Sequence, residues 1–261
     1  NVVRNCWVHH NQAMGIAMHN QTGGTIEANL IEFNGEHIQF DHGVYADGDG
    51  LTIRRNVVRH NASFGLHLYP SIRNSLVADN VIYGQVRRRG IIVSCPEGGG
   101  RNKIIHNTVV EDQPLAIWKG DGEIVANNIL VARGDGAAIV FNENTRNVLM
   151  DYNLCVPPLD RQGPHSITGD PLFVDPVKGL FWLRPGSPAI GKGSAAHATP
   201  TDFWGRPRAN DRSPDLGAAP YVPYLAADES RKLWEYGWTY FRHGQGGRVP
   251  DFWGVPLEGK R

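Results

Sequence analysis

Two segments of the chain, 22 residues apart, carry tyrosine, histidine and aspartate at alternating positions. Tyr45 and Asp47 alternate in the first segment, and His67 and Tyr69 alternate in the second. Because alternate residues of a β-strand project from the same face, each pair is expected on one face of its strand. Histidine and tyrosine can exchange protons with a bound substrate, so the set suits general acid–base catalysis. We therefore predict Tyr45, Asp47, His67 and Tyr69 as catalytic residues.

Further polar and aromatic residues are expected beside this set. The predicted substrate-binding residues are His19, Asp41, His42, Trp118 and Lys119. Uronate lyases and epimerases need a base for the proton next to the carboxylate, and an acid on the leaving group or opposite face. Glycoside hydrolases need two carboxylates about 5–10 Å apart, which Asp41, Asp47 and Asp49 could supply. The Tyr/His pairing favours lyase or epimerase chemistry slightly. The alternative is that Tyr45 and Tyr69 only stack and stabilise a sheet.

A repeat of 21 to 27 residues positions these side chains. Its marker is an asparagine with an apolar residue three positions before it and another two positions after it. The asparagines are Asn5, Asn29, Asn56, Asn80, Asn107, Asn128 and Asn153. A fixed period of this length with short β-branched segments predicts a solenoid of stacked coils. The asparagine amides are then expected to hydrogen-bond along the solenoid axis.

A second strand is expected in each coil after a position that is mostly glycine. The first and third residues after that position are apolar and should point inward, while the second and fourth point outward. In the later coils this alignment places Leu115 and Ile117, and then Ala137 and Ile139, inside. It places Tyr45 one coil from His67.

Whole segments resemble a known superfamily. The segment HGVYADGDGLTIRRNVVRHNASFGLHLYP looks like the repeats of the pectate-lyase-like, right-handed parallel β-helix proteins. The segment that begins GDPLFVDPVKGLFWLRPGSPAIGKG, within residues 169–218, is similar to the C-terminal signature of many secreted bacterial β-helix proteins. The resemblance implies an all-β, right-handed, single-stranded parallel β-helix, and the seven repeated asparagines predict about six to seven coils. It also implies export, to the outside, the cell surface or the periplasm, and a polysaccharide-related role.

Three regions are expected. Residues 1–156 form the coils, and because the chain begins inside a repeat, we expect its N-terminal part to be missing. The proline-rich residues 157–222 should wrap the solenoid and cover a sheet edge. Residues 223–261 form an aromatic tail with a short helical stretch, expected to dock on the solenoid or on a partner.

Charge and composition limit the partners. Lys+Arg and Asp+Glu are both 26, which gives no reason to expect nucleic acid, and no apolar run reaches the ~18 residues of a membrane span. Three cysteines, Cys6, Cys95 and Cys155, without paired spacing are expected to be packing residues. Calcium is a conceivable cofactor at Gly-Asp-Gly triplets such as 48–50, although such triplets also form plain turns. The run 87–89, three arginines, would meet an anionic sugar chain or stay solvated.

Two functions remain open. One is an extracellular carbohydrate-active protein that binds or acts on an acidic polysaccharide, with lyase or epimerase chemistry. The other is a non-catalytic structural or sugar-binding component of a surface layer or fibre, which would self-associate through the aromatic tail or the uncapped first coil.

Overall fold

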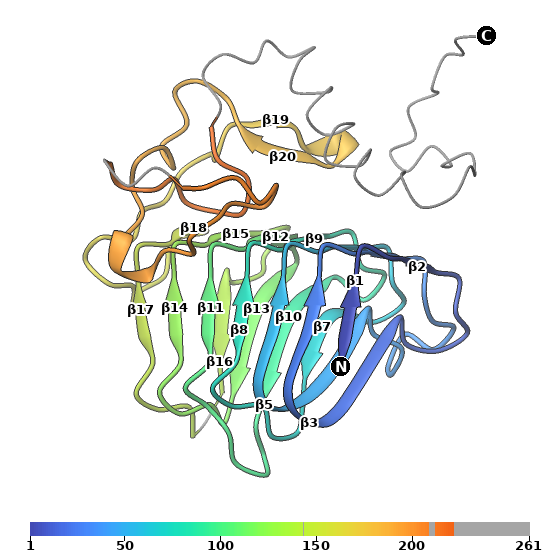
Figure 1. Cartoon of the computed structure of the whole chain (residues 1–261). Coiled ribbons are helices and arrows are strands. Elements are labelled where there is room, and N and C mark those ends of the chain that lie inside the picture. The colour runs from blue at the N-terminus through green and yellow to red at the C-terminus, as the bar shows by residue number, and fades with distance from the viewer. Residues whose placement is uncertain (143, 209–211, 222–261) are drawn as a thin grey trace, which may run out of the picture.

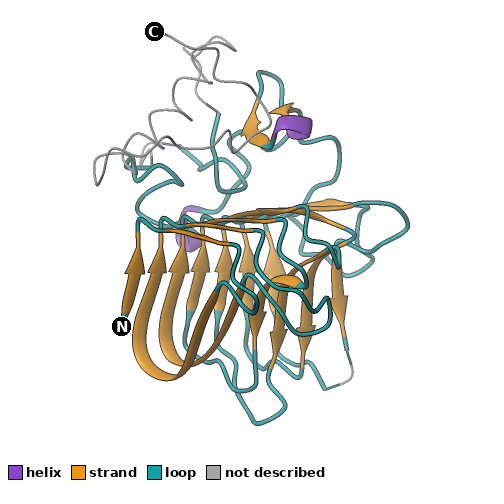
Figure 2. Cartoon of the chain, turned by 90° about the vertical axis from the view of Figure 1, so that its right-hand side faces the viewer, coloured by secondary structure: helices purple, strands orange, loops and turns teal. Residues whose placement is uncertain are grey.

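The computed structural model describes residues 1–142, 144–208 and 212–221. These residues form a right-handed parallel β-helix of about six turns, with very little helix, and a C-terminal segment packed along one side (Figure 1). The predicted fold class is confirmed. Figure 2 shows the strands stacked side by side along the solenoid.

Two large parallel sheets make up the solenoid among the described residues. The larger sheet contains β1 (Val2–Arg4), β3 (Ile16–Glu27), β5 (Val44–Arg54), β7 (Phe64–Leu68), β8 (Leu76–Ala78), β10 (Arg89–Ser94), β11 (Lys103–Ile105), β13 (Gln113–Trp118), β14 (Ile124–Ala126), β16 (Ile139–Phe141) and β17 (Leu149–Asp151). The other contains β2 (Trp7–His9), β4 (Leu30–Glu32), β6 (Val57–Arg59), β9 (Val81–Tyr83), β12 (Thr108–Glu111), β15 (Ile129–Ala132) and β18 (Leu154–Val156). β3 and β5 are long, because each contains two consecutive strands of one coil without a break between them. The first part of β5 pairs with β7 and its last part pairs with β8, which joins the two sides of the coil into one sheet.

Apolar residues of equivalent positions stack inside the coils. Ile26, Ile53, Val77, Ile104 and Val125 form one such column, and all are fully buried. Burial of each side chain of this size contributes about 1.5–3 kcal/mol. The β-branched and apolar sequence therefore both extends the backbone and fills the interior.

An asparagine ladder runs along one bend, as predicted, but it starts one coil later than the repeat pattern indicated. The side-chain amide of Asn29 donates to Asn56 at 3.0 Å, and Asn56 donates to Asn80 at 2.9 Å. The ladder continues through Asn107 and Asn128 to Asn153. In the first coil Cys6 occupies the ladder position.

The expected alignment of the first coil is wrong by one residue. Val3, not Val2, pairs with Ile26, and Val8, not Trp7, pairs with Ile31. Asn5 instead takes the left-handed backbone position that precedes the ladder, with φ 55°. Asparagine suits both positions, so the local pattern alone gave the wrong register.

The last coil is also displaced, here by two residues. Leu115 pairs with Ile139, and Ile117 pairs with Phe141, so the expected inward place of Ala137 is wrong. The glycine that marks the earlier coils has a steric cause: a Cβ on Gly43 would lie 2.7 Å from the carbonyl oxygen of Gly65. The glycine is replaced by Pro114 in the coil before and by Ala138 in the last coil, so Gly136, two residues earlier, was the wrong marker.

The C-terminal segment has two parts. Residues 163–167 follow the edge of the last coil: Gly163 donates to the carbonyl of Met150 in β17, and Ile167 bridges Leu154 in β18. The following residues lie along the outer face of the seven-stranded sheet, above β18, β15, β12 and β9 in Figure 1. Phe173, Phe181 and Trp182 pack there in one buried cluster with solenoid residues from Leu30 to Leu154. Most of this segment therefore covers a side of the solenoid rather than its end.

The segment contains β19 (Phe173–Asp175) and β20 (Leu180–Leu183), which pair antiparallel, and the short 3-10 helices η1 (Pro176–Lys178) and η2 (Ala195–His197). The expected tail, residues 223–261, lies outside the described residues.

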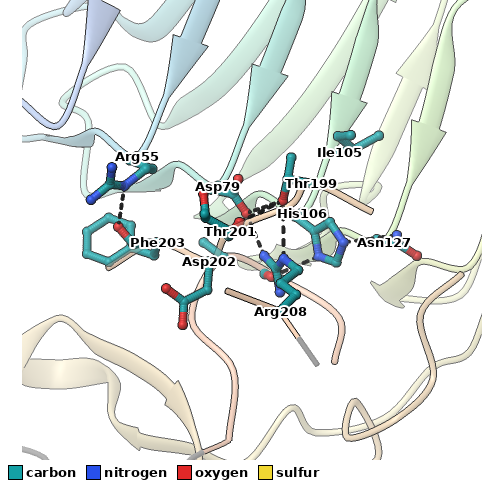
Figure 3. Close-up of polar contacts among 12 residues, drawn as sticks. Arg55, Asp79, Ile105, His106, Asn127, Thr199, Thr201, Asp202, Phe203 and Arg208 are labelled. Atoms are coloured by element: carbon teal, nitrogen blue, oxygen red, sulfur yellow. Dashed lines mark hydrogen bonds and ion pairs between the residues drawn. The ribbon is translucent and has the colours of Figure 1, made fainter. Parts of the chain in front are cut away.

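A buried polar cluster fastens the segment to the coils (Figure 3). Arg208 forms an ion pair with Asp79 of the solenoid, and both side chains are almost fully buried. Thr199 donates to Asp79 and accepts from Arg208 at 3.1 Å. Two coils further, Asn127 donates to the carbonyl of Ser194 at 2.9 Å. We call Asp79, Thr199 and Arg208 the clamp.

Candidate functional site

The outward face of β5 and β7 brings the predicted catalytic side chains together. Tyr45 pairs directly with His67, as predicted. The ring centroids of Tyr45 and His67 are 5.2 Å apart, those of His67 and Tyr69 5.2 Å, and those of Tyr45 and Tyr69 6.2 Å. All three side chains are half-buried, so they remain accessible on this face.

Asp47 is almost fully buried and holds His19. The Nδ1 atom of His19 lies 2.8 Å from Oδ1 of Asp47, and the backbone N–H of Asn20 donates to Oδ2 at 3.2 Å. A carboxylate only accepts, so Nδ1 of His19 carries the proton. In the neutral imidazole, Nε2 is then the free acceptor. A break in the β3–β5 register between Met18 and Gln21 turns His19 toward Asp47.

A hydrogen bond from His42 places the proton of His67 on Nε2, whereas His19 carries its proton on Nδ1. The backbone N–H of Phe64 donates to Nδ1 of His42 at 3.3 Å, so Nε2 of His42 carries the proton. That Nε2 lies 2.9 Å from Nδ1 of His67 and donates to it. The proton of neutral His67 is therefore on Nε2, which becomes a hydrogen-bond donor. Two histidines on one face thus present an acceptor and a donor.

Burial fixes the charge states of this group. Burial, with the charge of Arg87, lowers the pKa of His67 to about 4. Burial, with the charges of His67 and Arg87, lowers the pKa of His42 to about 3. Burial, followed by the effect of Tyr69 and Asp47, raises the pKa of the Tyr45 phenol. At neutral pH both imidazoles are uncharged and Tyr45 keeps its proton.

The predicted substrate-binding residues divide. His19 lies in the group, with its ring 4.8 Å from that of Tyr45. His42 is buried behind His67 and positions it rather than reaching a ligand. Asp41 is buried and accepts from the backbone N–H groups of Glu36 and His37, so it shapes a loop.

Trp118 and Lys119 lie further along the sheet. Trp118 pairs with Ser94 of β10 and packs over Ile92 and Ala116. Lys119 is exposed, and its backbone N–H donates to Asn142 at 3.0 Å. The structure does not bring these two residues into the Tyr45–His67 group.

Two features of the site lie outside the predicted set. Phe64 places its ring 5.2 Å from His67 and 4.7 Å from His42. Arg87 and Arg89 lie over that ring at 5.0 and 5.4 Å. The sequence signal for Phe64 is weak, because its place immediately before a strand glycine is variable from coil to coil.

The described residues contain no group of three or more His, Cys, Asp or Glu arranged to hold a metal ion. At the triplet 48–50, the Asp49 carboxylate is occupied by Arg73 at 3.0 Å and Asn74 at 2.8 Å, which does not support the expected calcium. Cys95 and Cys155 are buried, and burial raises the pKa of each thiol to about 12.

Comparison with known proteins gives one family. No curated protein matches the chain. A family model described as "NosD: Periplasmic copper-binding protein (NosD)" matches residues 1–117. Its periplasmic description agrees with the predicted secreted, cell-surface or periplasmic location. No helix in the described part of the chain is long and apolar enough to cross a membrane.

The histidine pair of the site does not fit a copper ion. Nε2 of His42 and Nδ1 of His67 are joined by a hydrogen bond at 2.9 Å, and a metal between them would need both lone pairs and more room. The buried thiols belong to the interior of the coils. In its first coils, including the strands that carry Tyr45 and His67, the chain is similar to the NosD family of periplasmic copper-binding proteins.

Proposed function

We propose that the face formed by His19, Tyr45, His67 and Tyr69 acts on an acidic polysaccharide outside the cytoplasm, by moving the proton next to a uronate carboxylate. The observation that carries the proposal is the opposite proton placement on His19 and His67. Environments that separate two similar groups in this way assign them different roles in acid–base chemistry.

Each step has a group to perform it. Nε2 of His19, held by Asp47, takes the proton from the carbon next to the carboxylate. The Nε2–H of His67 donates to the carboxylate, on which negative charge develops. In a lyase reaction the electron pair then forms a carbon–carbon double bond and breaks the bond to the leaving sugar oxygen, which takes the proton of Tyr45. In an epimerase reaction the phenol instead returns a proton from the opposite face.

Hydrolysis is less well supported. It needs one carboxylic acid and one carboxylate facing the glycosidic bond. Asp41 accepts hydrogen bonds within its own loop, and Asp47 accepts from His19 and Asn20. Asp49 is engaged by Arg73. None of these carboxylates is offered as a pair to a ligand.

The test is an activity panel with matched variants. Purified protein is incubated with polygalacturonate, alginate and glycosaminoglycans, while unsaturated products are followed by absorbance and epimers by proton NMR. General acid–base groups contribute about 10²- to 10⁴-fold each, so Tyr45→Phe and His19→Gln should lose activity by that factor. The control is His165→Gln, since His165 makes the same contact with Asp151 at 2.7 Å elsewhere.

The outcome also separates the alternative function. The ring contacts among Tyr45, His67 and Tyr69 would equally serve a surface that only binds sugar. Binding without product on any uronate polymer would refute the catalytic proposal and favour that alternative. Equal activity of wild type and Tyr45→Phe would refute the role of the phenol.

A further inference from the structure

The three arginines of the run 87–89, beside the site, make different contacts. Arg88 points to Asp112, with its Nη1 atom 3.3 Å from the carboxylate. Arg87 and Arg89 instead both lie over the ring of Phe64. Arg87 is also tied to the loop before β5, since it donates to the carbonyl of Gln39 at 3.2 Å. Arg87 and Arg89 are therefore held over the Phe64 ring, which also contacts His67.

The two guanidinium groups have no anionic partner in the described part of the chain. Among the ion pairs found there, Arg88 is the member of the triplet that has a carboxylate. Both Arg87 and Arg89 are half-buried. Burial, with the charge of Arg87, lowers the pKa of Arg89. Two like charges on one ring repel each other, and a bound anion would relieve that repulsion.

We infer that Arg87 and Arg89, seated on the Phe64 ring, form a subsite for a carboxylate group of the glycan. Arginine binds planar oxyanions through parallel N–H groups, which lysine does not. The subsite rests on the proposed function for its position, because the Phe64 ring also touches His67. The ligand group that this subsite recognises is a carboxylate, held within reach of the N–H donor on His67.

Binding measurements test the subsite without requiring turnover. Titration calorimetry is performed with oligomers of polygalacturonate and alginate, and with the same oligomers after reduction of the carboxyl groups to alcohols. Arg87→Gln and Arg89→Gln are each expected to weaken binding of the acidic oligomers by roughly 10-fold, as for a lost charge-assisted hydrogen bond. Binding of the reduced oligomers should be unchanged. Arg88→Gln is the matched control, since it removes one charge from the same triplet and should change binding by less than about 2-fold.

The outcomes separate this inference from the proposed reaction. Equal weakening by all three substitutions, or equal weakening on acidic and reduced oligomers, would overturn the subsite. Tighter binding of a sulfated glucan, which has no carboxyl groups, than of the uronate oligomers would overturn the assignment to a carboxylate. Carboxylate-dependent binding that needs Arg87 and Arg89, in a protein without turnover, would support the subsite and refute the reaction. Thermal melting of each variant identifies loss of folding.

Discussion

Replacing Asp47 with asparagine should move the proton of His19 from one ring nitrogen to the other. In the wild type, the two carboxylate oxygens accept from two different donors, His19 Nδ1 at 2.8 Å and the Asn20 N–H at 3.2 Å. An asparagine has one oxygen. If that oxygen faces His19, the amide NH₂ group faces the Asn20 N–H and leaves it without an acceptor. If the amide flips, its NH₂ group faces Nδ1, which must then accept.

The size of the effect follows from that lost acceptor. An unsatisfied N–H costs about 1–3 kcal/mol when buried, and the low end applies because Asn20 is exposed. About 1 kcal/mol corresponds to roughly a fivefold preference for the flipped amide. His19 should then carry its proton mainly on Nε2, so the acceptor for the substrate proton is lost. The substitution also removes the negative charge of Asp47 beside the ring.

Histidine-selective ¹⁵N NMR at pH 8 measures this directly. The wild type should show His19 with a protonated Nδ1, and the Asp47→Asn variant should show it with a protonated Nε2. His165, paired with Asp151 at 2.7 Å, gives an unaffected reference in the same spectra. An unchanged Nδ1 proton in the variant, or a protonated Nε2 in the wild type, would refute the reasoning.

Three further predictions concern stability. Arg208→Met leaves the buried Asp79 carboxylate without its ion-pair partner and should lower the free energy of unfolding by about 3–5 kcal/mol. The control Arg206→Met, whose ion pair is partly exposed, should lower it by at most about 1 kcal/mol. Equal losses for the two variants in calorimetric melts would contradict the role of the clamp. The pKa of His67, lowered by burial to about 4, lies below that of an unfolded histidine, so stability should fall as the pH drops from about 6.5 to 4. His67→Gln should remove roughly 3 kcal/mol of that fall, and an unchanged pH dependence of the urea midpoint would count against the low pKa. Asn80→Leu breaks the ladder on both sides and should destabilise by roughly 3 kcal/mol, whereas a loss below 1 kcal/mol in urea unfolding would mean that the ladder is dispensable.

The fold was predictable because one physical requirement repeats in every coil. A stacked asparagine must pair with the next, and the apolar residues around it must face inward, so the period is visible in the sequence. The predicted alignment of the first coil was wrong because asparagine is compatible with two neighbouring positions. Asn5 lies in the left-handed bend, and Cys6 takes the ladder position that follows it.

A second polar ladder had no comparable signal. Asn34 donates to Asn61 at 2.9 Å, and Asn61 donates to Gln85 at 3.1 Å. The residue type in this ladder changes from asparagine to glutamine and then to Glu111. The hydrogen bonds therefore continue from coil to coil, but no single residue type repeats in the sequence.

The site was predictable only in its strands. Alternation placed Tyr45 beside His67, since both lie in the regular part of the coil. The role of His42 depends on a backbone N–H from the next coil, and the clamp joins Asp79 to Arg208 across 129 positions. Such contacts follow from the packing of the chain and leave no local pattern.

Proton abstraction from a uronate is the central claim, and NMR in D₂O measures it whether the reaction ends in cleavage or epimerisation. Oligomers of polygalacturonate and alginate are incubated with the protein in D₂O, and the signal of the hydrogen at the carbon next to the carboxylate is followed. Epimerisation replaces that hydrogen with deuterium, and cleavage removes it as the double bond forms. The account predicts loss of the signal with the wild type, at a rate reduced about 10²-fold or more in His19→Gln. Oligomers that bind to the Tyr45–His67 face without any loss of that signal would contradict it.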